Sequence, residues 1–207
     1  MKIKLNAQSS VRIESDSVIY FDPYMIKHGT NDADIIFITH PHHDHFSPDD
    51  IAKLSNENTI IVAPVSMEDK IKELDVPFAS FFPIKPGDTV TVLGIRVSAV
   101  PAYNTDKPMH KKEYGWVGYV IYVEDTKIYA AGDIDAIEEG EALDVDIAFV
   151  PIGGTFTMNY EEAAEFINTM RPAKVIPYHY GTLVGDEKDG KRFRKLIERG
   201  IDVELML

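Results

Sequence analysis

The stretch "DIIFITHPHHDHFSPDD", residues 34–50, places four of the chain's seven histidines directly after a strand-like run. "DIIFIT" is continuously apolar and β-branched, as in strands covered on both faces. "SPDDIAKL" then begins with Ser47 as a predicted N-cap, Pro48 at the first helical position and acids in the first turn. The stretch therefore predicts a strand and a helix with the histidines between them.

These histidines follow an H-x-H-x-D-H spacing that is typical of metal ligands. Pro41 favours extended geometry at His40, so the side chains of His40 and His42 can point to one side and share an ion. Asp44 and His45 stand where the chain turns, and they can serve a second ion. Imidazole and carboxylate together suit Zn²⁺, with Fe²⁺ or Mn²⁺ as chemically reasonable competitors. The competing interpretation is a solvated polar loop.

Further ligands must come from other strand ends. Asp133 follows the apolar run "IYAAG", where Gly132 permits close backbone approach, and a carboxylate there suits a bridge between two metals. His179 closes the strand in "VIPYHYG". Asp22 in "YFDPY" either orients a ligand histidine through its second ring nitrogen or forms a plain Asp-Pro turn. His43 occupies an x position and is predicted to lie at the surface or behind the ligands.

Together these motifs resemble the metallo-β-lactamase superfamily, over nearly the whole chain and in the expected order. Within it, "FDPY", "AGD" and "PIGGTFTM" are similar to the hydrolase branch that includes L-ascorbate-6-phosphate lactonase and N-acylphosphatidylethanolamine phospholipase D. The resemblance implies an α+β fold, a four-layer αββα sandwich with the metal site at one edge of its two sheets. We find no linker or internal repeat, so residues 1–207 are expected to form a single domain.

The resemblance also implies a ligand set for two metal ions: His40 and His42 for the first, Asp44, His45 and His179 for the second, and Asp133 for both. The family usually places one more histidine on the first metal, close after the strand corresponding to "VSAVPAYN". No histidine stands there. His110, in the following loop, is the favoured replacement, and the Asn104 amide or a water molecule are the alternatives.

Such a site predicts a metal-dependent hydrolase. Two metals about 3.5–4 Å apart can share a water, lower its pKa and hold the resulting metal-bound hydroxide against an ester, lactone, thioester or phosphodiester of a small molecule. Asp44 and Asp133 are the predicted catalytic residues, because a coordinated carboxylate can accept or relay a proton.

The loop "PIGGTFTMN", residues 151–159, is the predicted substrate contact. Backbone N–H groups of Gly153 and Gly154 and the hydroxyls of Thr155 and Thr157 could receive a phosphate or carboxylate. The alternative is a strand-to-helix turn capped by Asn159 or Thr157.

The composition of the chain argues against several other functions and partners. The chain has 34 acids against 21 Lys and Arg, a net charge of -13, which works against nucleic-acid binding. It has no cysteine, so thiolate metal sites and thiol nucleophiles are excluded. Apolar runs are too short for a membrane span, and a cytoplasmic location is expected. Homo-oligomerisation stays open. The rival functions are a nuclease or nucleotide phosphodiesterase that uses the basic run 188–195, and a non-catalytic metal- or ligand-binding protein.

Overall fold

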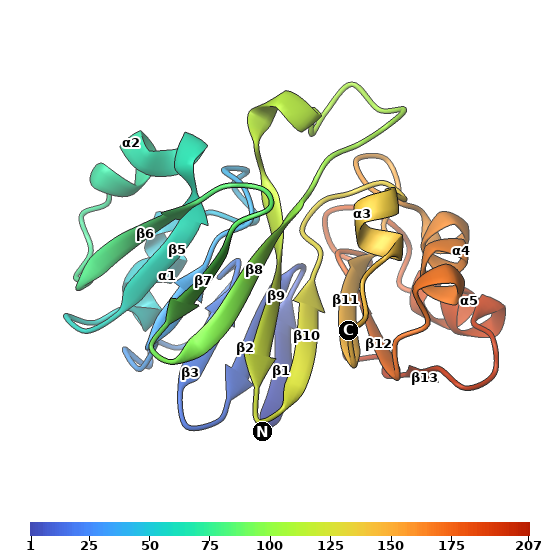
Figure 1. The fold of residues 1–207 in the computed structure, drawn as a ribbon, viewed down its shortest axis with the longest axis horizontal. Coiled ribbons are helices and arrows are strands. Elements are labelled where there is room, and N and C mark those ends of the chain that lie inside the picture. The colour runs from blue at the N-terminus through green and yellow to red at the C-terminus, as the bar shows by residue number, and fades with distance from the viewer. The chain divides into compact units, whose positions relative to one another are not determined.

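The computed structural model describes all residues, 1–207, and the chain divides into two compact units, Met1–Lys85 and Pro86–Leu207. Each unit is built on one mixed β-sheet that carries short helices (Figure 1). The α+β class predicted from the sequence is confirmed. The single domain over 1–207 stays a prediction. No helix has the length and apolarity needed to cross a bilayer.

The sheet of the first unit has six strands in the order β1-β2-β3-β4-β5-β6. They are β1 (Lys2–Ala7), β2 (Ser10–Glu14), β3 (Val18–Phe21), β4 (Ile35–Phe37), β5 (Ile60–Pro64) and β6 (Ser80–Ile84). The first three strands pair antiparallel, whereas β3, β4, β5 and β6 run parallel. The carboxyl ends of β3 and β4 therefore meet at one edge of the sheet.

Three short helical segments accompany this sheet: α1 (Pro48–Leu54), the 3₁₀ turn η1 (Val65–Met67) and α2 (Glu68–Lys72). The predicted helix after the histidines is confirmed, because Ser47 caps α1 by accepting a hydrogen bond from the backbone N–H of Asp50. Ile51 and Leu54 are fully or almost fully buried against apolar side chains of the central strands. This packing fixes the point from which the histidine segment departs.

The sheet of the second unit has seven strands in the order β13-β12-β11-β10-β9-β8-β7. They are β7 (Thr89–Val92), β8 (Ile95–Pro101), β9 (Val117–Val123), β10 (Thr126–Ala130), β11 (Ile147–Pro151), β12 (Lys174–Tyr178) and β13 (Asp202–Val203). β7 to β10 pair antiparallel, and β10 to β13 run parallel. As a result β8, β10, β11 and β12 all end at the same edge.

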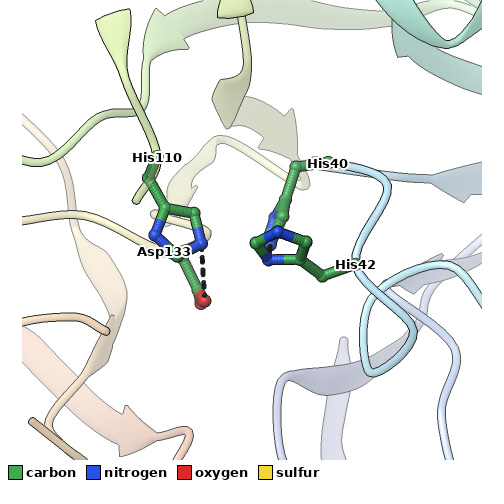
Figure 2. A group of neighbouring side chains, drawn as sticks. All are labelled: His40, His42, His110 and Asp133. Carbon is green, nitrogen blue, oxygen red and sulfur yellow. Dashed lines mark hydrogen bonds and ion pairs between the residues drawn. The ribbon is translucent and has the colours of Figure 1, made fainter. Parts of the chain in front are cut away.

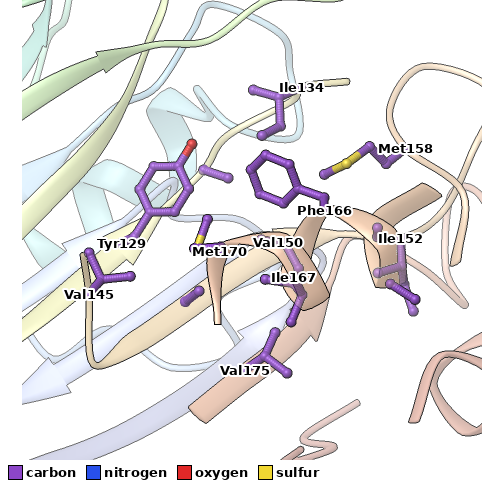
Figure 3. Close-up of a cluster of buried hydrophobic side chains, with 14 of the residues drawn as sticks. Tyr129, Ile134, Val145, Val150, Ile152, Met158, Phe166, Ile167, Met170 and Val175 are labelled. Atoms are coloured by element: carbon purple, nitrogen blue, oxygen red, sulfur yellow. The ribbon is translucent and has the colours of Figure 1, made fainter. Parts of the chain in front are cut away.

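The helical segments of this unit are η2 (Lys112–Tyr114), α3 (Glu138–Glu141), α4 (Tyr160–Met170) and α5 (Asp189–Leu196). Helix α4 buries Phe166, Ile167 and Met170, as the helical spacing of its apolar residues predicts, in the cluster drawn in Figure 3. Burial of each such side chain stabilises the fold by about 1.5–3 kcal/mol. The alternative interpretation of the preceding loop is confirmed in one respect, because Asn159 caps α4 in a reciprocal capping box with Glu162.

One predicted helix end is wrong. The run "GKRFRKLIERG", residues 190–200, predicts a helix that Gly200 terminates, but α5 ends at Leu196. Asn168 of α4 explains the early end: its side chain donates to the carbonyl of Leu196 and accepts from the N–H of Glu198. A side chain from another helix thus satisfies the groups that a longer helix would have paired internally.

Candidate metal centre

At the edge where β3 and β4 end, Asp22 follows β3 and Thr39 and His40 follow β4. The carboxylate of Asp22 is buried, and it accepts hydrogen bonds from the backbone N–H of Thr39 at 2.8 Å and from its hydroxyl at 2.7 Å. Asp22 also adopts a left-handed backbone with φ 42°, which is uncommon for a residue with a side chain. The predicted Asp-Pro turn is therefore also a polar anchor for the histidine segment.

The first two histidines of the motif face one another. His40 Nε2 lies 3.0 Å from His42 Nδ1, and the two rings, drawn in Figure 2, meet edge to face with their centroids 4.6 Å apart. The other ring nitrogen of His40, Nδ1, lies 3.0 Å from the Thr39 hydroxyl. Because Thr39 holds one side of the imidazole, the opposite nitrogen is directed towards His42. Two nitrogens at this separation are suited to a shared cation.

Asp44 and His45 are the other two candidate ligands of the first unit. His45 Nδ1 lies 2.7 Å from Asp22 Oδ2, while His45 Nε2 lies 3.6 Å from Asp44 Oδ2. Asp22 therefore has the geometry of the predicted orienting residue, because its contact with Nδ1 leaves Nε2 directed at Asp44. Burial raises the pKa of Asp22, and the opposing contacts with His45 and Thr39 only partly offset that rise.

In the second unit, Asp133 lies between two histidines. One carboxylate oxygen is 3.3 Å from His110 Nε2 and the other is 3.4 Å from His179 Nε2, and all three residues are buried. Figure 2 shows the dashed contact between His110 and Asp133. Asp133 comes from the end of β10, His179 from the end of β12 and His110 from the loop after β8. Three candidate ligands that lie far apart in the sequence are thus gathered at one sheet edge.

The structure gives Asn104 a place behind His110. Its side-chain amide nitrogen is 3.2 Å from His110 Nδ1 and donates to the carbonyl of Phe156 at 2.7 Å, and its backbone N–H donates to the His110 carbonyl. The His110 ring also meets the edge of Trp116, with ring centroids 5.4 Å apart. This arrangement favours His110 over Asn104 as the ligand beside Asp133.

Four further polar residues support the ligand groups and were not predicted. Besides Thr39, they are Gln8, Asp135 and Tyr178. Gln8 donates to Asp44 at 3.3 Å, and the Tyr178 hydroxyl accepts from the backbone N–H of Gly132, next to Asp133. The sequence gives no signal for Gln8, because the burial of this side chain is visible only in the structure.

Asp135 organises the loop that carries His110. Its buried carboxylate accepts from the backbone N–H of Thr105 at 3.0 Å and from the side chain of Lys107. The loop between β8 and η2 is therefore tied to the residue two positions after Asp133. His110 itself has φ 56°, a conformation that such anchoring helps to maintain.

The loop 151–159 differs from its predicted form. The backbone N–H groups of Gly154, Phe156 and Thr157 donate within the loop, and the buried Thr157 hydroxyl contacts the Met158 carbonyl, so these groups are not presented to a ligand. The substrate contacts predicted for Gly153 and for the exposed side chain of Thr155 stay predictions.

Gly153 has a packing role instead. A Cβ atom at this position would lie 2.2 Å from the backbone oxygen of His179. The glycine lets the two strand ends approach, which sets the position of His179. His43, by contrast, has a side chain that is 78% exposed, in agreement with its predicted surface position.

One family model spans the segments that carry all the candidate ligands. The model of the β-lactamase superfamily domain matches residues 2–179. A UPF0173 metal-dependent hydrolase from Nanoarchaeum equitans is 31% identical over 211 residues, which cover 98% of this chain and 94% of the relative.

Comparison with solved structures also finds proteins of this fold. A protein from Parabacteroides distasonis named as a metal-dependent hydrolase has a TM-score of 0.81 at 31% identity, covering 98% of this chain and 91% of its own. The metallo-β-lactamase fold protein YhfI from Bacillus subtilis has a TM-score of 0.73 at 12% identity, covering 97% of this chain and 88% of its own, and it shows the fold alone. The chain therefore belongs to the β-lactamase superfamily and, within it, to the UPF0173 metal-dependent hydrolase family.

Proposed function

We propose that this protein is a hydrolase in which the candidate ligands of the first unit and those of the second unit together hold two metal ions. It would cleave an ester, lactone, thioester or phosphodiester bond of a small molecule. The observation that carries the proposal is the buried Asp133 carboxylate with an imidazole nitrogen beside each of its oxygens, at 3.3 and 3.4 Å. The family model, which spans residues 2–179, supports the joint use of both groups.

The donor set fits such ions. Each candidate ligand offers an imidazole nitrogen or a carboxylate oxygen, and the chain has no thiolate. A buried carboxylate is costly unless it is paired or binds a metal, and the surroundings of Asp133 supply both opportunities. Zn²⁺ is the first choice for this mixture of ligands, with Fe²⁺ and Mn²⁺ as competitors. The ligands would be His40, His42, Asp44, His45, His110, Asp133 and His179.

When bound, the ions would lower the pKa of a water and stabilise negative charge on the substrate. The chain's own residues would do the rest. Asp133 would be a ligand to both ions, and Asp22 would keep His45 in the tautomer that leaves Nε2 without a proton. A carboxylate oxygen of Asp44 would accept the proton released during attack, while Gln8 holds the side chain in place.

The test is to purify the protein without chelators, determine its metal content and assay lactone, thioester and phosphodiester substrates with defined metals. Asp44→Ala is expected to reduce turnover by about 10²–10⁴-fold, the usual contribution of a positioned proton acceptor. His43→Ala is the matched control, because this exposed neighbour should be replaceable. Absence of bound metal, or full activity of Asp44→Ala, would contradict the proposal.

The same panel separates the rivals. A nuclease would prefer bis(p-nitrophenyl) phosphate and would need the basic run, yet Arg192 of that run is paired with Asp189 at 2.7 Å and Arg194 donates to the carbonyl of Val203. These contacts fit a solvated helix face better than an RNA surface. A non-catalytic protein would bind metal and turn over none of the substrates. The similarity to the lactonase and phospholipase D branch makes lactones and phosphodiesters the first substrates to try.

A further inference from the structure

The first unit contains a cavity of about 450 Å³ whose lining includes none of the proposed metal ligands. Lys4, Arg12 and Tyr20 lie directly opposite one another on β1, β2 and β3, so their side chains share one face of the sheet. The segment 25–28 and Leu54 complete the walls. The volume falls in the range of about 300–1,000 Å³ that is usual for small-molecule sites.

The charge of this cavity is opposite to that of the chain. The lining includes Lys2, Lys4, Arg12 and Lys27 but only one carboxylate, Glu14, in a protein of net charge -13. Arg12 is held by Asp32 at 2.7 Å and by Glu14 at 2.8 Å, whereas Lys4 and Lys27 have no ion-pair or hydrogen-bond partner. Two ammonium groups are therefore available to an anion.

Part of the lining is apolar. Met25 is 52% exposed beside the buried Ile26, and both line the cavity. Asp50 fixes this wall by accepting from the backbone N–H groups of Met25 at 2.8 Å and Ile26 at 3.1 Å, and Lys53 donates to the Ile26 carbonyl. A wall that is already ordered costs little to organise when a ligand binds.

We propose that this cavity binds a small molecule that carries a phosphate or carboxylate group on an apolar body. The ammonium groups of Lys4 and Lys27 pair with the anion, and Met25 and Ile26 contact the apolar part. Because no proposed metal ligand lines the cavity, this binding is separate from hydrolysis and goes beyond the proposed function.

The test measures binding of phenylphosphonate, which carries an anion on a ring and has no hydrolysable ester, by calorimetry on the purified protein. Inorganic phosphate and benzyl alcohol are the comparison probes and should each bind more weakly. The double variant Lys4→Gln, Lys27→Gln should bind phenylphosphonate about tenfold more weakly or worse, since charge-assisted hydrogen bonds are lost. The control Lys191→Gln, Lys195→Gln makes the same charge change on exposed residues of α5 and should bind normally.

Two measurements locate the site. Methyl signals of Met25, Ile26 and Leu54 should shift in the wild-type protein when phenylphosphonate is added, and Asp133→Asn should leave the affinity unchanged. Equal weakening in both lysine double variants, loss of binding in Asp133→Asn, or no binding to the wild-type protein would each overturn the proposal.

Discussion

The two units supply their candidate ligands in opposite ways. In the first unit, His40, His42, Asp44 and His45 lie on one short segment between β4 and α1, and their geometry follows from the local chain and one anchor, Asp22. In the second unit, residues 110, 133 and 179 come from three separate parts of the chain, and they meet because β8, β10 and β12 end at one edge and because Asp135 anchors the loop after β8. Substitutions that disturb packing should therefore displace the candidate ligands of the second unit (the second group) more than those of the first unit (the first group).

The largest expected effect comes from Gly153→Ala. The new methyl group would collide with the backbone oxygen of His179, and relief requires movement of the chain that carries this ligand. Overpacking of this kind should lower the free energy of unfolding by about 1–3 kcal/mol. Metal content, measured by elemental analysis, should fall as well, because His179 would leave its place beside Asp133.

Gly154→Ala is the matched control for this prediction. Gly154, unlike Gly153, has a positive φ, 69°, and a Cβ atom there would meet nothing closer than 3.5 Å. Its substitution should cost about 1 kcal/mol of backbone strain and leave the metal content unchanged. If Gly153→Ala retained full metal occupancy, the positions of the ligands in the second unit would not depend on packing between strand ends, which would contradict the difference between the two units described above.

The same contrast explains what the sequence could predict. The first group is visible because its spacing is a local pattern, and α1 is visible because Ser47 and Pro48 mark its start. In the second unit, Asp133 and His179 were predicted from their positions at strand ends, whereas His110 required the family resemblance. Even then, the sequence shows that residue 153 is a glycine but not that the His179 carbonyl lies against it. Spacing alone gives no way to infer such a contact.

The conformation of the loops is the other feature that the sequence could not predict. The amino-acid sequence of the loop before η2 does not indicate that Asp135 anchors this loop or that His110 adopts a left-handed backbone. The end of α5 was mispredicted for the same reason, because Asn168 on another helix decides it. Local patterns predict elements and their starts, whereas contacts between elements decide where loops and ligands finally lie.

A smaller and more local effect is expected from Asp22→Asn in the first unit. The neutral amide removes a carboxylate whose ionised form is disfavoured by burial, so the free energy of unfolding should change little. Metal affinity should fall about 10–100-fold, because His45 loses the partner that orients it. Competition with a chelator measures the affinity, and Asp16→Asn, at an exposed position, is the control. Unchanged affinity would show that the first group needs no anchor beyond its own segment.

The smallest effect concerns the outer support of the loop that carries His110. Glu139 accepts from Lys112 at 2.8 Å and from the Tyr103 hydroxyl at 3.0 Å, and these two residues flank the loop. The hydrogen bond from Lys112 is the main reason that the pKa of Glu139 lies below its ordinary value. The ionised carboxylate therefore stabilises the fold above the ordinary glutamate pKa of about 4.3, and this contribution is lost as the pH falls through the lowered pKa.

Because the pair is partly exposed to solvent, Glu139→Gln should lower the melting temperature at neutral pH by no more than about 2 °C. The difference between this variant and the wild-type protein should vanish in acid, where Glu139 is protonated in both states. Glu138→Gln, at the exposed neighbouring position, should show no such convergence. Metal content should stay unchanged, because Asp135 still holds the loop from within. A marked loss of metal in Glu139→Gln would mean that support at the solvent face, rather than the buried carboxylate, decides where His110 lies.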